Sequence, residues 1–108
     1  MPSNEVYRPP HVLGYKSPIV ALPYRKLQRI IEKEEPTSPN AVEAYFALGY
    51  MYENATNGVT KPDLKSASVN YETAALGGHT QAAYFLACMH LEGRGVPENF
   101  DEGAKWYR

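Results

Sequence analysis

The sequence predicts an all-α fold, an α-solenoid of antiparallel helix pairs, on three observations. Apolar residues recur at three- and four-residue spacing through most of the chain after residue 22. One predicted helix and the beginning of the next are duplicated along the chain. Clusters of glycine, proline and asparagine separate the periodic segments. The 108 residues therefore form one small domain or part of a larger one.

The duplication defines the register of a repeat. Leu86 lies 38 positions after Leu48, and the same offset pairs Ala44 with Ala82, Phe46 with Tyr84, Gly49 with Ala87, Met51 with Met89 and Tyr52 with His90. Past the turn the offset is 36, which pairs Asp63 with Asn99, Ala67 with Gly103 and Tyr71 with Tyr107. The first turn is therefore two residues longer, and turns are where helical repeats tolerate insertions.

Residues 1–22 are expected to form an extended Pro-rich arm. Its four prolines each remove a backbone donor and bias the preceding residue away from helix. Its apolar residues are too numerous for a solvated tail, for example Val6, Tyr7, Ile19 and Val20. We expect the arm to lie either in a groove of its own domain or on a partner.

Residues 23–39 are expected to form a capping helix and a turn. Pro23 suits the first turn of an amphipathic helix that ends before Pro36. Basic residues begin this helix and acidic residues end it, against the helix dipole, so the helix must depend on packing. A basic patch at Arg25, Lys26 and Arg29 is a weaker interpretation than a solvated face, because acidic residues close the same helix.

Residues 40–108 are expected to hold two repeats, the second incomplete. The helix that begins near residue 40 is capped either by Ser38 before a proline or by Asn40 with Glu43 three residues on. Gly49 inside it costs roughly 1 kcal/mol of helix propensity, which indicates close approach by another helix.

The remaining helices have their own start and stop signals. Asp63 can cap a helix that ends at Gly77 and Gly78. Thr80 can open the next helix, after which Gly93 and Gly95 turn the chain. Asn99 with Glu102 then forms a capping box for a last helix of barely two turns.

The run LACMHLEGRGVPENFDEGAKWY, residues 86–107, resembles a Sel-one-like repeat, a relative of the tetratricopeptide repeat. The resemblance covers about residues 40–108. The residues that define it in the two copies are Ala44, Leu48, Gly49 and Gly58, then Ala82, Leu86, Gly93, Gly95 and Trp106. The second copy departs from the family at Ala87, His90, Asn99 and Gly103.

The resemblance implies a right-handed superhelix that mainly binds other proteins, here as an adaptor or an accessory or scaffolding subunit of a larger assembly. About three repeats are usually needed to bury the apolar faces of such helix pairs. We therefore expect either that the natural protein continues beyond Arg108 or that a partner completes the solenoid. Contact is expected through the N-terminal arm and the open C-terminal end.

Catalytic, cofactor and metal sites are not predicted, so we do not expect an enzyme. The histidines His11, His79 and His90 lack metal-ligand spacing, and Cys88 lies two helical positions from His90, so their side chains point apart. Two alternatives remain. One is a single-stranded RNA-binding helical repeat, although its inner helices lack basic residues, and the other is an enzyme with an unrecognised site.

The amino-acid composition limits the classes of partner and the cellular compartments that we expect. A net charge of -1, from 11 basic and 12 acidic residues, gives no electrostatic footprint for DNA. No stretch approaches the roughly 20 apolar residues of a membrane span, so no membrane insertion is expected. A single cysteine in apolar helical surroundings suits a reducing, intracellular compartment, either cytoplasmic or mitochondrial.

An aromatic surplus supplies the candidate partner-binding residues. Tyr45, Tyr50 and Phe85 stand where the family often carries smaller or polar residues, and tyrosine is enriched at interfaces. We hypothesise that these three, with Cys88, line the inner face and contact a protein partner. The alternative is that they fill the core beneath the arm.

Overall fold

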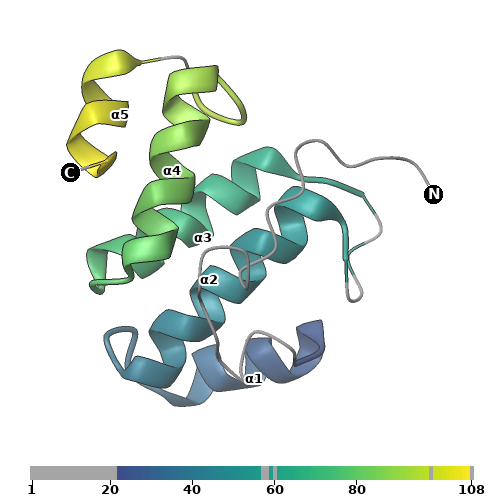
Figure 1. Cartoon of the computed structure of the whole chain (residues 1–108). Helices are drawn as coiled ribbons and strands as arrows, with labels where there is room; N and C mark the ends of the chain where they lie inside the picture. The colour runs from purple at the N-terminus through teal and green to yellow at the C-terminus, as the bar shows by residue number, and fades with distance from the viewer. Residues whose placement is uncertain (1–21, 57–58, 60, 98, 108) are drawn as a thin grey trace.

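The computed structural model describes residues 22–56, 59, 61–97 and 99–107, with the side chains of Phe100 and Tyr107 left aside. Over these ranges the chain is an all-α solenoid without strands, as predicted. Its helices are α1 (Tyr24–Lys33), α2 (Pro39–Asn54), α3 (Leu64–Leu76), α4 (Thr80–Glu92) and α5 (Phe100–Tyr107). They stack in chain order, with α1 and α5 at opposite ends (Figure 1). The predicted arm, apart from Leu22, and the repeat residue Gly58 lie outside the described residues.

Side-chain caps begin three of the helices as the sequence predicts. Of the two candidates for α2, Ser38 is the cap, since its Oγ accepts the N–H of Ala41 at 3.1 Å and a proline follows it. Asp63 Oδ1 accepts the N–H of Ser66 at 3.0 Å before α3, and Asn99 Oδ1 accepts the N–H of Glu102 at 3.1 Å before α5. Each bond satisfies a donor that the first helical turn leaves unpaired.

The start of α1 differs slightly from the prediction. Pro23 has extended backbone angles and precedes the helix instead of standing in its first turn. Its carbonyl accepts the N–H groups of Lys26 and Leu27, so it still supplies the first backbone acceptor. Leu27 is fully buried, and Ile30 and Ile31 pack beside it against α2, which confirms α1 as a helix that covers the front of the repeats.

Equivalent backbone bonds in the two repeats confirm the register. Ala55 and Gly93, 38 positions apart, both end their helices in the left-handed region and donate to the carbonyls of Met51 and Met89. The N–H of Asp63 donates to Tyr52 O at 2.8 Å, and the N–H of Asn99 to His90 O at 2.9 Å. In this second pair of bonds the donors are 36 positions apart and the acceptors 38. The longer first turn is therefore accommodated before Asp63.

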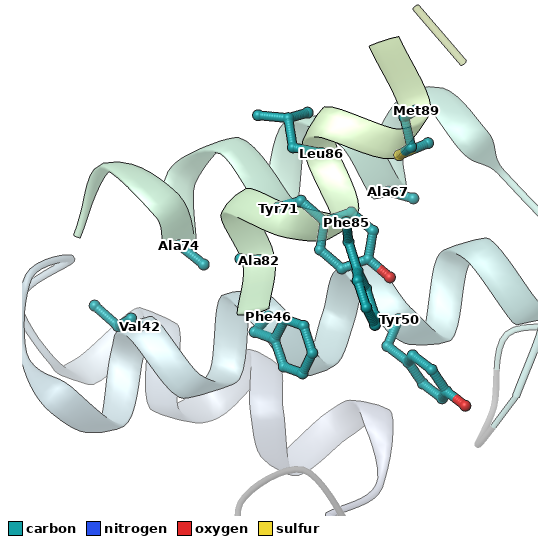
Figure 2. Close-up of a cluster of buried hydrophobic side chains, with 10 residues drawn as sticks. All are labelled: Val42, Phe46, Tyr50, Ala67, Tyr71, Ala74, Ala82, Phe85, Leu86 and Met89. Carbon is teal, nitrogen blue, oxygen red and sulfur yellow. The ribbon is translucent and has the colours of Figure 1, made fainter. Parts of the chain in front are cut away.

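Two apolar clusters lie on either side of α2. The larger joins α2, α3 and α4 and contains Val42, Phe46, Tyr50, Ala67, Tyr71, Ala74, Ala82, Phe85, Leu86 and Met89 (Figure 2). The smaller joins α1 to the opposite face of α2 and contains Leu27, Ala44, Ala47, Leu48 and Met51. Each large apolar side chain that is fully buried contributes about 1.5–3 kcal/mol. One helix, α2, therefore ties the capping helix to the rest of the solenoid.

Close packing explains the glycine at position 49, as its cost in helix propensity indicated. A Cβ at this position would lie 2.6 Å from Cδ1 of Tyr71, whose side chain is fully buried. The absence of a side chain therefore lets α3 approach α2 closely.

Candidate functional site

The polar side chains of the described residues do not assemble a metal centre. No group of three or more His, Cys, Asp or Glu side chains within them could hold a metal ion. Of the three histidines considered from sequence, His11 lies outside the described residues. His79 precedes the first turn of α4, whereas His90 lies in the last.

His79 is a structural cap with an unusual environment. Its Nδ1 accepts the N–H of Ala82 at 3.1 Å, and its ring stacks on Phe46 with centroids 4.4 Å apart. Burial lowers the pKa of His79 to about 4, so the ring is neutral at physiological pH and can accept this bond. Its Nε2 lies 3.5 Å from Oε1 of Glu43, and burial raises the pKa of that carboxyl. The helix α4 begins at Thr80, as expected, but its cap is the preceding residue, which the sequence did not indicate.

A second polar group ties the repeats together. Glu53 has no exposed side-chain surface; its Oε1 accepts a hydrogen bond from Tyr71 OH and its Oε2 one from Arg94 Nη1, both at 2.7 Å. These residues come from α2, α3 and the turn after α4. A buried carboxylate held by a cation and a hydroxyl is a structural junction, which single-sequence analysis missed because the partners are far apart along the chain.

The four predicted contact residues do not form one surface. Phe85 is fully buried, with its ring centroid 5.4 Å from those of both Phe46 and Tyr71. Its position is that of a core residue, beside the other two rings in Figure 2. Tyr50 is 8% exposed and its hydroxyl end points away from the cluster (Figure 2), while Tyr45 packs half-buried against it. The partner contacts of these residues and of half-buried Cys88 stay a prediction.

The repeat register relates the faces of α2 and α4. The face of α2 that packs toward α1 carries Ala44, Ala47, Leu48 and Met51. At an offset of 38, the face of α4 that packs back on α2 and α3 carries Ala82, Phe85, Leu86 and Met89, all of them buried. The two helices therefore present the same side to the helix before them.

The opposite side of α2 faces the next repeat. Its residues Val42, Phe46 and Tyr50 are 7%, 0% and 8% exposed in the cluster with α3 and α4. The equivalent positions on α4 are Thr80, Tyr84 and Cys88, which we call the forward face. Thr80 is exposed, whereas Tyr84 and Cys88 are half-buried. Tyr84 packs against the core cluster, with its ring 5.9 Å from that of Phe85. A helix seated on α4 as α4 is seated on α2 would lie over this forward face.

Comparison with known proteins agrees with these two units. The family model of the Sel1 repeat matches residues 42–79 and 80–108, which together make up more than half of the chain. These segments correspond to the pairs α2 with α3 and α4 with α5. No curated protein and no solved structure matches the chain. None of the helices in the described part of the chain is long and apolar enough to span a bilayer.

Proposed function

Because the chain belongs to the Sel1 repeat family, whose repeats are generally protein–protein interaction modules, we propose that it is an adaptor or accessory subunit that binds a protein partner through the forward face of α4. In this proposal the partner contributes a helical segment, which lies over Thr80, Tyr84 and Cys88.

The repeat equivalence of α2 and α4 carries the proposal. Three positions that are at most 8% exposed on α2 correspond to one exposed and two half-buried positions on α4. A partner can still bury the apolar surface of these half-exposed side chains. Each Å² of apolar surface that is buried contributes roughly 25 cal/mol to binding. Cys88 occupies the position of Tyr50, so the forward face is less bulky than its counterpart and leaves space for a partner's side chain.

The partner helix should resemble the buried side of α4 itself. That side combines small residues with large apolar ones, Ala82 with Phe85, Leu86 and Met89. Small residues let helix axes approach, while the large ones fill the space between them. Charged side chains are absent from the forward face, so apolar contact and not charge would dominate this interface.

Paired substitutions test the proposal. The tagged full-length chain would be purified from its native cells, its co-purifying proteins identified, and each then purified and tested directly for binding. Thr80→Arg with Cys88→Arg should reduce affinity for the direct partner by about tenfold or more, because buried unpaired charge is costly.

The matched control places two arginines on exposed apolar positions of α3, Val69→Arg with Leu76→Arg. These side chains are 54% and 72% exposed. The control should keep both the partner and the far-ultraviolet circular dichroism of the parent. Retention of the partner by the folded α4 variant would refute binding through the forward face.

A further inference from the structure

A groove runs along the outer side of α1, at the opposite end of the solenoid from the forward face. It has a volume of about 320 Å³ and is lined by Leu22, Lys26, Arg29, Ile30, Lys33 and Glu34. Leu22 and Ile30 are half-buried and form an apolar floor, because both also pack against the smaller core cluster. Lys26, Arg29 and Lys33 are exposed and follow one another along one side of the helix.

Among the described residues, no carboxylate neutralises the three cations. None of them lies within 4.0 Å of a carboxylate oxygen in the part of the chain that the structure describes. The carboxylate of Glu34, which also lines the groove, is turned to the start of α2. Its Oε1 accepts the Ser38 hydroxyl at 2.8 Å and its Oε2 accepts the Asn40 amide at 3.2 Å. Glu34 therefore serves the α1–α2 connection.

The helix dipole favours Lys33, in the last turn of α1, but it disfavours Lys26, in the first turn. The first turn of α1 holds no acidic residue, and basic residues follow there, where the helix dipole disfavours positive charge. An anionic ligand would relieve this unfavourable arrangement. The apolar floor between the cations adds a place for an uncharged side chain.

We propose that this groove binds an acidic segment of a partner protein, with one branched apolar side chain on Leu22 and Ile30 and carboxylates beside Lys26, Arg29 and Lys33. Charge complementarity selects this occupant over the chain's own first 21 residues, which hold one acidic residue, Glu5, against Arg8 and Lys16. The groove is separate from the forward face. The two binding proposals are therefore tested by different variants, and the failure of one does not decide the other.

A labelled synthetic peptide is the probe. The peptide Asp-Glu-Asp-Leu-Asp-Glu-Asp would be titrated into the full 108-residue chain and binding followed by fluorescence anisotropy and amide chemical shifts. Binding should shift the amides of α1, weaken as salt rises, and fall several-fold when serine replaces leucine in the peptide. Lys26→Glu with Arg29→Glu should weaken binding about tenfold, because two attractions become repulsions.

The control variant Lys61→Glu with Lys65→Glu makes the same change in net charge at exposed positions away from the groove. It should change the peptide affinity less than twofold. The proposal is overturned if the peptide does not bind, if it shifts no amide of α1, if the two variants weaken binding equally, or if the serine peptide binds as well. Self-association that Lys26→Glu with Arg29→Glu abolishes, without peptide binding to the parent, would instead assign the groove to a second copy.

Discussion

Arg94 and Glu53 are joined by a 2.7 Å hydrogen bond between Nη1 and Oε2, across 41 residues of sequence. The bond connects the last turn of α2 with the turn after α4, and therefore one repeat with the next. The Glu53 side chain is fully buried, whereas that of Arg94 is 20% exposed. The first repeat therefore contributes a buried charge, and the folded second repeat supplies a cation that pairs with it.

Arg94→Ala should lower the free energy of unfolding by about 2–3 kcal/mol. The substitution removes the cation from a buried carboxylate, and breaking such a pair costs more than the pair itself contributes. Urea denaturation followed by circular dichroism measures the loss. Adding Glu53→Gln to Arg94→Ala should restore part of it, because a neutral amide is less costly to bury. A double variant no more stable than the single one would contradict the buried-charge explanation.

Lys105→Ala is the control for that experiment. Its Nζ lies 4.0 Å from Oε1 of Glu102, and both side chains are largely exposed. Exposed pairs contribute little because water screens them, so this variant should stay within about 0.5 kcal/mol of the parent.

Ala55→Gly should stabilise the protein by about 0.5–1 kcal/mol. Ala55 ends α2 with φ 54°, a left-handed conformation that is unfavourable for a residue with a Cβ. Its counterpart in the second repeat is already glycine, Gly93 with φ 66°. Gly93→Ala should therefore destabilise by about 1 kcal/mol, so the two variants should move the midpoint of thermal unfolding in opposite directions. A decrease with Ala55→Gly would contradict the equivalence of the two helix ends.

Gly49→Ala should destabilise by about 1–3 kcal/mol despite the better helix propensity of alanine. The new methyl group would lie 2.6 Å from the Tyr71 ring, whose hydroxyl is held by Glu53, so the ring cannot move aside freely. Gly103→Ala is the matched comparison. Its methyl group would lie 2.6 and 2.7 Å from Cδ2 and Cγ of half-buried Leu91 and 3.3 Å from the carbonyl oxygen of Ala87. Because the leucine side chain can rotate, we expect a smaller loss than for Gly49→Ala. Equal losses in the two variants, measured by urea denaturation, would show that Tyr71 is not the obstacle.

His79 should make stability fall as the solution becomes acidic. Burial places its pKa at about 4 in the folded chain, below the ordinary value of 6.5. Between these two values the unfolded chain binds the proton more readily, so stability is greatest above pH 6.5 and declines toward pH 4. The contribution is about 1–3 kcal/mol by this linkage.

His79→Asn tests this origin of the pH dependence, since asparagine can cap a helix but does not titrate in this range. The slope of unfolding free energy between pH 6.5 and 4.5 should be smaller in the variant than in the parent. Glu43 works in the opposite direction, because its raised pKa lets the folded chain bind a proton first. An unchanged slope would show that His79 is not the cause of the acid sensitivity.

Local signals predicted most of the fold. The caps Ser38, Asp63 and Asn99 are short-range features, and the offsets of 38 and 36 reappear as equivalent backbone bonds. Gly49 was interpretable because an unfavourable glycine in a helix needs a packing reason. These features depend on neighbouring residues or on the internal duplication, both of which one sequence contains.

Long-range contacts were not predictable in the same way. Nothing in one sequence pairs Glu53 with Arg94, and histidine is not among the residues preferred as helix caps, so His79 carried no signal. The burial of Phe85 did have a signal. Phe85 lies three residues after Ala82 and four before Met89, and the repeat register makes it equivalent to Ala47, which is also buried. Composition drew attention to the aromatic ring, while periodicity would have placed it in the core.

Hydrogen–deuterium exchange on the chain with its purified direct partner tests the central claim most directly. We predict slower exchange along α4, Thr80–Glu92, in the complex, and unchanged exchange along α3, whose outer residues Val69 and Leu76 are exposed. A partner that binds without slowing exchange in α4 would contradict the claim that its forward face is the interaction surface.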